Sequence, residues 1–166
     1  MNIFRTTLFI FCISFSLTIQ ADDNLPIADK VLVDKSERKM WLLKSGNKYR
    51  EYAISLGDSP EGHKVQQGDE KTPEGLYTID YRNPQSSYHL SLHITYPNKK
   101  DKAHARSMGV DPGGLIFIHG LPNGYESYSW YFKGRDWTDG CIAVNNEEIR
   151  EIWKLVKNGT PIEILP

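Results

Sequence analysis

The stretch Ile116–Asn146 of this 166-residue chain reads IFIHGLPNGYESYSWYFKGRDWTDGCIAVNN. Its start lies within a continuous apolar run, Leu115–His119, which is bounded by glycines and is typical of a buried strand. A second short apolar run begins at Cys141, directly after Asp139 and Gly140. The stretch therefore predicts two strands, with His119 at the end of the first and Cys141 at the start of the second.

The remaining sequence indicates a mainly β domain. Short runs rich in β-branched and aromatic residues are separated by Gly, Ser and Asn, as in a meander of antiparallel strands. The segment Gly57–Lys71 is polar and rich in glycine, and we expect a loop there. The other predicted strands are Lys30–Asp34, Lys39–Lys44, Lys48–Leu56, Leu76–Tyr81, Tyr88–Tyr96 and Pro161–Leu165.

One or two helices complete the prediction. Ile149, Ile152, Trp153 and Val156 follow the spacing of a single buried helical face. Asn145 and Glu148 resemble a capping box at its start, and Gly159 and Pro161 are expected to end it. A second short helix is predicted at Lys99–Met108.

Residues 1–21 are predicted to be a secretory signal peptide. Arg5 precedes the apolar run Thr7–Ile19, and Ala21 stands before an acidic pair. The run is shorter than the roughly 20 residues of a membrane-spanning helix, which disfavours the alternative of an uncleaved anchor. We expect export to the periplasm, no membrane attachment after cleavage, and one domain over residues 22–166.

Charge and cysteine content narrow the possible functions. Cleavage would remove Arg5, so the formal charge of −1 would become −2. No run of Lys or Arg forms a basic patch, which argues against nucleic acid as a partner. Cys12 lies in the signal peptide, so Cys141 is left unpaired. In an exported protein this indicates either a reactive thiol or a small buried hydrophobe, and the count alone does not decide between them.

The surroundings of Cys141 suit a nucleophile. An ordinary thiol has a pKa of about 8.5 and needs a base to act near neutral pH, and His119 is the candidate base. Backbone N–H groups must also face the developing oxyanion, and the Asp139-Gly140-Cys141 turn could supply them. A third group must orient the imidazole. One His and one Cys are weak evidence on their own, so catalysis and a structural role both remain open from these residues.

The motifs around this pair resemble those of the YkuD-type L,D-transpeptidases. His119-Gly120, a long loop and then Thr138-Asp139-Gly140-Cys141-Ile142 are similar to the family signature H-G, loop, S/T-x-G-C-I/V. Upstream, Ser55-Leu56-Gly57 and Gly68–Tyr77 (GDEKTPEGLY) are similar to the family's strand and its Thr-Pro-x-Gly-x-Tyr/Phe turn. The likeness extends from about residue 31 to residue 164.

The resemblance implies a β-rich catalytic domain, with a mixed sheet or sandwich, that acts on peptidoglycan stem peptides. It implies cleavage before the terminal D-Ala of a tetrapeptide and transfer of the acyl group to an amine. Cys141 would be the nucleophile and His119 the base, oriented by the main-chain carbonyl of Gly120. The N–H groups of Gly140 and Cys141 would form the oxyanion hole, and Thr138 would shape the turn.

The sequence departs from the family at Ala143, where many members carry an Arg that is thought to hold the substrate's carboxylate. Arg135 is our first candidate replacement, with Arg106 and Lys133 as alternatives. Trp137 and Tyr131 are candidate substrate contacts. The loop Gly120–Gly140 is rich in aromatic residues, which could cover the cleft or pack the loop down.

Two other kinds of function remain as alternatives. A hydrolase with the same site would give the acyl group to water, either trimming stems or releasing a wall-attached protein. A non-catalytic wall-binding module would need neither the His-Gly nor the Gly-Cys motif. His89 and His93 would lie on one face of the predicted strand Tyr88–Tyr96, but further metal ligands are not apparent. We expect no metal, no cofactor and a monomer.

Overall fold

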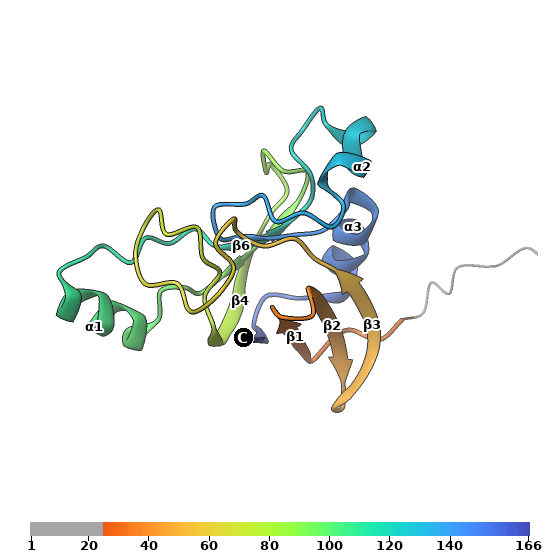
Figure 1. Cartoon of the computed structure of the whole chain (residues 1–166). Coiled ribbons are helices and arrows are strands. Elements are labelled where there is room, and N and C mark those ends of the chain that lie inside the picture. Colours follow the sequence, from red (N-terminus) through yellow and green to blue (C-terminus); the bar gives the residue numbers. More distant parts are fainter. Residues whose placement is uncertain (1–24) are drawn as a thin grey trace, which may run out of the picture.

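The computed structural model describes residues 25–166, so the predicted signal peptide lies outside the described residues. The mainly β class is confirmed, because eight strands form one mixed sheet in the order β3-β2-β1-β8-β4-β5-β6-β7 (Figure 1). The strands are β1 (Lys30–Asp34), β2 (Lys39–Lys44), β3 (Asn47–Ala53), β4 (Gly75–Asn83), β5 (Ser91–Ile94), β6 (Phe117–His119), β7 (Ile142–Ala143) and β8 (Thr160–Leu165).

The sheet curls so that its two edges meet beside the Cys141 turn. The β1–β8 and β6–β7 pairs are parallel and the other pairs are antiparallel. Just beyond β3, Ser55 exchanges two backbone hydrogen bonds of 2.9 Å with Ala143 in β7, and Gly57 bridges to Thr138. Because the segment after one edge strand pairs with the segment at the other edge, the turn before Cys141 is held from both sides.

Two longer helices and one aromatic segment accompany the sheet. Helix α1 (Lys99–Met108) has the predicted bounds and lies at the far side of the molecule from α3 (Figure 1). Helix α3 (Asn146–Leu155) begins with the predicted capping box of Asn145 and Glu148. It ends at Leu155 rather than near Gly159, because Val156 is buried with an extended backbone and leads the chain toward β8. The unpredicted short helices η1 (Glu126–Tyr128) and α2 (Ser129–Phe132) carry four of the six aromatic residues of the loop Gly120–Gly140.

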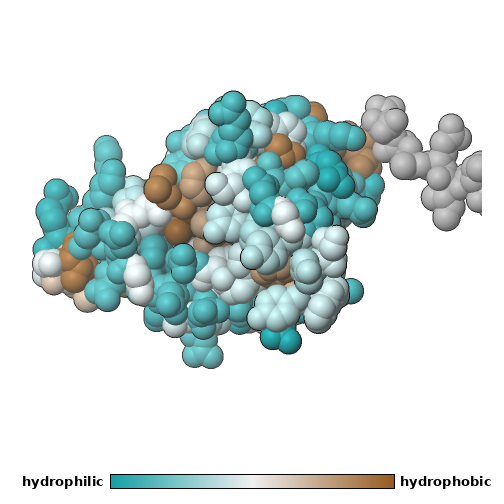
Figure 2. Space-filling view, turned by 90° about the horizontal axis from the view of Figure 1, so that it is seen from above, coloured by the Kyte–Doolittle hydropathy of each residue, from teal (hydrophilic) through white to brown (hydrophobic). Residues whose placement is uncertain are grey.

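The hydrophobic core lies between the curled sheet and α3. Ile149 and Ile152 of α3 are fully buried against strand residues such as Leu42, Ile118 and Ile162. Burying each such side chain contributes about 1.5–3 kcal/mol, so α3 contributes substantially to the stability of this core. The face in Figure 2 is mostly hydrophilic, with small separate hydrophobic areas.

The predicted strand Tyr88–Tyr96 is shortened in the structure to β5, Ser91–Ile94. His89 has a left-handed backbone, φ 65°, and the N–H of Gly120 donates to the Tyr88 carbonyl at 3.1 Å, so this segment turns instead of continuing the sheet. His89 and His93 therefore do not share a strand face, which corrects the prediction. Within residues 25–166 there is no group of three or more potential metal ligands, and no helix long and apolar enough to cross a bilayer.

The long loop between β3 and β4 is tied to the sheet by a buried lysine. Lys35, 2% exposed, donates from Nζ to the Gly62 carbonyl at 2.7 Å and the Thr72 carbonyl at 3.1 Å, and pairs with Glu74 at 2.7 Å. A buried ammonium is tolerated only with such a full set of partners. The anchor holds the loop whose residues line one side of the cleft described next.

Candidate active site

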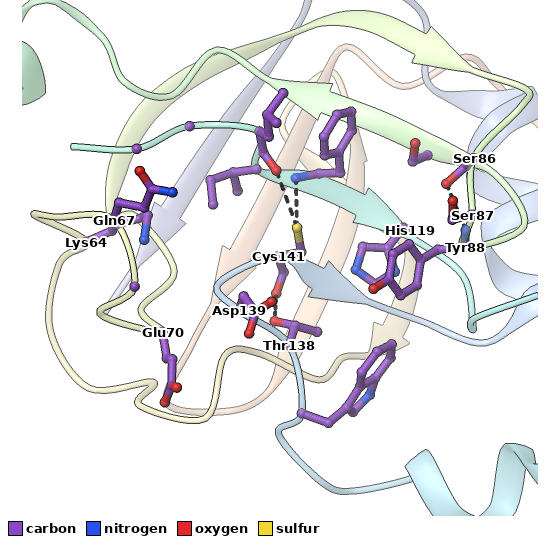
Figure 3. A pocket seen from close by; sticks show the side chains of 18 of the residues that line it. Lys64, Gln67, Glu70, Ser86, Ser87, Tyr88, His119, Thr138, Asp139 and Cys141 are labelled. Carbon is purple, nitrogen blue, oxygen red and sulfur yellow. Dashed lines mark hydrogen bonds between the residues drawn. The ribbon is translucent and has the colours of Figure 1, made fainter. Parts of the chain in front are cut away.

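Cys141 and His119 line one cleft of about 910 Å³. Lys64, Gln67 and Glu70 from the β3–β4 loop lie on one side of Cys141 (Figure 3). His119 and the 86–88 segment lie on the other side. The cleft therefore has two halves, which we call the Gln67 half and the His119 half, with the sulfur between them.

The turn that carries Cys141 depends on two glycines. Gly140 has φ 117°, and a Cβ there would collide with the carbonyl oxygen of Lys71. A Cβ on Gly57 would collide with the carbonyl of Glu70 and approach the Gly140 nitrogen to 2.9 Å. Three backbone segments thus meet at contact distance, which only glycine permits. The Ser-Leu-Gly motif contributes Gly57 to this packing, and the Gly-Cys motif contributes Gly140.

The Thr138 side chain closes the turn. Its hydroxyl donates to the Cys141 carbonyl at 2.8 Å and accepts the Gly140 N–H at 3.1 Å. The Gly140 N–H therefore already has a partner, which differs from its expected role as an oxyanion donor. Of the two N–H groups expected in the oxyanion hole, that of Cys141 remains, and Asp139 is exposed at the cleft.

The thiol lies against the backbone at the start of β6. The Phe117 N–H donates to Sγ at 3.4 Å, and Sγ lies 3.6 Å from the Leu115 carbonyl. Burial disfavours the thiolate and raises the pKa of Cys141 to about 11, although the Phe117 contact opposes this. The resting cysteine is therefore a neutral thiol near pH 7.

His119 is 4% exposed at the end of β6. Its Nδ1 lies 2.7 Å from the Gly120 carbonyl, the contact that the resemblance implied. Because a carbonyl can only accept, the neutral ring must carry its proton on Nδ1, which leaves Nε2 with a free lone pair. Burial lowers the pKa of His119 to about 4, so the ring is neutral at physiological pH.

Gly120 is held against the start of α3. A Cβ at this position would approach Asn146 Oδ1 to 2.6 Å and the His89 Cβ to 3.1 Å. The same Asn146 oxygen accepts the Leu121 N–H at 2.8 Å. The capped end of α3 thus fixes the backbone that orients His119. No pattern in the sequence indicates this contact of Asn146.

Aromatic rings surround the imidazole. The Tyr88 ring lies beside that of His119 (Figure 3), with 4.5 Å between the centroids. The Trp137 ring centroid lies 5.6 Å from that of His119. Trp137 was a predicted substrate contact, and it does line the cleft. The sequence predicts a strand at Tyr88, but the chain turns at His89, and this turn brings the Tyr88 ring over His119.

Other predicted contacts lie outside this cleft. The Arg135 guanidinium lies 4.8 Å from the Tyr131 ring centroid, and neither residue lines the Cys141 cleft. The aromatic loop packs mainly on itself, with Phe132 against Trp137 at 4.9 Å between centroids. Of its six aromatic residues, Trp137 reaches the cleft, whereas Tyr125, Tyr128, Trp130, Tyr131 and Phe132 do not.

Comparisons with known proteins point to one family. The family model for the YkuD L,D-transpeptidase catalytic domain matches residues 28–164. The Escherichia coli (strain K12) protein named "Putative L,D-transpeptidase YafK" is 30% identical over 132 residues, which cover 76% of this chain and 46% of YafK.

Solved structures agree with that match. The helical cell shape determining protein Pgp2 from Campylobacter jejuni is 29% identical with a TM-score of 0.62, over 81% of this chain and 46% of Pgp2. Bd1075 from Bdellovibrio bacteriovorus is 28% identical with a TM-score of 0.58, over 84% of this chain and 48% of Bd1075. The chain thus spans about half the length of these relatives.

Proposed function

Since the chain belongs to the YkuD family of L,D-transpeptidase catalytic domains, we propose that it is an exported peptidoglycan L,D-transpeptidase that works through a Cys141 acyl-enzyme. The substrate is the tetrapeptide stem, and the acyl group passes to an amine. The observation that carries the proposal is the cleft that His119 and Cys141 both line, in which the hydrogen bond from Nδ1 of His119 to Gly120 leaves Nε2 with a free lone pair.

The first half-reaction starts from neutral groups. As Sγ of Cys141 attacks the carbonyl before the terminal D-Ala, the thiol proton moves to Nε2 of His119. The C–N bond then breaks, the leaving amine takes the proton from Nε2, and a thioester remains on Cys141. A ring whose pKa is held near 4 is a strong acid once protonated, which favours proton delivery to the departing amine.

The second half-reaction reverses these steps with a new amine. The acceptor nitrogen attacks the thioester, its proton passes to Nε2 and then to the departing sulfur, and the thiol is restored. The negative charge on the tetrahedral oxygen develops next to the Cys141 N–H, the donor that the Thr138 hydroxyl leaves free. One well-placed donor of this kind contributes about 10²–10³ in rate.

The test is incubation of the purified protein with tetrapeptide muropeptides and an excess of a D-amino acid, followed by mass spectrometry. We expect exchange of the terminal D-Ala, and cross-linked dimers when stems are concentrated. Cys141→Ala serves as the inactive control. Intact tetrapeptides in every reaction would contradict the proposal.

Hydrolysis is the second candidate, and a specific observation favours it. Closing a site protects a reactive intermediate from water, yet five of the six loop aromatics lie outside this cleft. Water could then compete for the thioester, giving a carboxypeptidase or an amidase that releases wall-attached protein. Tripeptide as the sole product at high amine concentration would favour the carboxypeptidase. Release of a wall-bound peptide without action on tetrapeptides would favour the amidase.

A further inference from the structure

Leu115 is an unusual residue at the cleft. It lines the cleft next to Cys141 and is 75% exposed, more than the other exposed large hydrophobic residues of the described chain. Its backbone is left-handed, with φ 56°. Single exposed leucines are common on protein surfaces, so exposure alone carries no argument. Leu115 is unusual because it combines high exposure, a left-handed backbone and a position next to Cys141.

The left-handed backbone is costly for a residue with a side chain. Steric repulsion between Cβ and the following carbonyl disfavours it, and glycine avoids the penalty. The two preceding residues are Gly113 and Gly114, so glycine occurs directly beside this position. The exposed Leu115 side chain gains little packing in return. Strain of this kind is retained mainly where function requires it.

The backbone geometry has a use that glycine could serve equally well. It directs the Leu115 carbonyl to Sγ of Cys141, at 3.6 Å, before the chain enters the core at Ile116. A glycine would present the same carbonyl without strain. The alignment of the thiol therefore explains the backbone conformation but leaves the leucine side chain without a role.

The chemistry of the reaction indicates which part of the substrate lies near this side chain. The leaving amine must receive a proton from His119, so the leaving group occupies the His119 half of the cleft (Figure 3). The acyl-donating part then occupies the Gln67 half. Leu115 belongs to that half, because nearby Gly113 packs against Gln67 and the Gln67 N–H donates to the Asp111 carbonyl at 2.8 Å.

We infer that Leu115 is a specificity-determining residue whose side chain contacts the aliphatic side chain of the stem residue that donates its carbonyl to Cys141. The inference rests on the proposed function and adds a substrate preference to it. Covering an exposed leucine with methylene groups removes apolar surface from water, and each buried methylene is worth about a fourfold change in binding. A long unbranched side chain at the donor residue is thus preferred over a short one.

The experiment compares two tetrapeptides that differ only at the third residue, lysine or 2,3-diaminopropionate. The enzymes are the wild type, Leu115→Asn, Leu115→Gly and the control Leu76→Asn. Asn tolerates the left-handed backbone and is polar. Leu76 is an exposed leucine, 67%, on β4 and outside the cleft. Turnover, thermal melting and alkylation of Cys141 by iodoacetamide are measured for each.

We expect wild type and Leu76→Asn to favour the lysine stem by about tenfold or more in kcat/KM. Leu115→Asn and Leu115→Gly should lose this preference. Their rate of Cys141 alkylation should stay within about twofold of the wild-type rate, because the backbone conformation is kept. Leu115→Gly should also melt about 2–4 °C higher, because strain is relieved. A mutant that loses turnover and gains stability is not explained by a structural role.

An unchanged preference in Leu115→Asn would overturn the inference while leaving the proposed function intact. Equal losses of alkylation and turnover would overturn it as well, since the leucine would then act through the thiol. A folded wild-type protein whose Cys141 is alkylated at the slow rate of a neutral thiol but that turns over neither stem would refute the proposed function, and the inference with it.

Discussion

The pH dependence of Cys141 alkylation is a sharp prediction, because two buried groups determine it. At a pKa of about 11, about one thiol in 10⁴ is ionised at pH 7, whereas an ordinary thiol with a pKa near 8.5 is ionised to about 3%. Since the thiolate is the species that reacts, iodoacetamide should modify folded Cys141 roughly 300-fold more slowly than the unfolded chain at pH 7. The rate should rise about tenfold per pH unit up to at least pH 10.

The assay is intact-protein mass spectrometry after timed alkylation between pH 6 and pH 10, with a denatured sample as reference. His119→Ala should be alkylated no more slowly than wild type at neutral pH, because a neutral imidazole does not stabilise a thiolate. A rate plateau between pH 6 and pH 8 that disappears in His119→Ala would refute the reasoning and indicate an ion pair.

Three further predictions concern stability, each measured by chemical or thermal unfolding. Gly140→Ala should lower the free energy of unfolding by about 2 kcal/mol or more, because φ 117° and the nearby Lys71 carbonyl both oppose a side chain. Gly46→Ala, where a side chain would have no atom within 4 Å, should lower it by about 1 kcal/mol. Lys35→Met should lower the free energy of unfolding by about 3 kcal/mol, because it leaves buried acceptors unpaired. Lys39→Met, which removes an exposed ion pair, should lower it by at most about 1 kcal/mol. Equal effects of the two substitutions would refute the role of Lys35 as an anchor of the β3–β4 loop. His119 titrates at about 4 in the folded protein and 6.5 ordinarily, so the wild type should lose about 3 kcal/mol as pH falls from 6.5 to 4, and His119→Gln should lack this loss.

Much of the fold was predictable because its signals are local. The bounds of α1 and the capping box of α3 follow from side chains that act within one turn of helix, and the structure has both. The strand starting at Tyr88 was wrong for a non-local reason. The Tyr88 carbonyl accepts a hydrogen bond from the N–H of Gly120, which is distant in sequence. No pattern around His89 reveals the left-handed backbone of that residue.

The candidate site shows the same division. The sequence motifs indicated His119 and Cys141 as site residues, and in the structure both line one cleft. It could not reveal that Thr138 occupies the Gly140 N–H, since that depends on one rotamer. Likewise, Arg135 and Tyr131 were chosen by closeness in sequence to Cys141, but the loop folds on itself and keeps them out of the cleft.

The central claim is that Cys141 carries the acyl group, and a mass measurement tests it most directly. The protein is mixed with tetrapeptide stem, quenched in acid within seconds, and digested with a protease for peptide mapping. We predict that the peptide containing Cys141 gains the mass of the stem without its terminal D-Ala, that hydroxylamine removes the adduct, and that Cys141→Ala forms none. Turnover of the tetrapeptide without any adduct on Cys141, or with full activity in Cys141→Ala, would contradict the account.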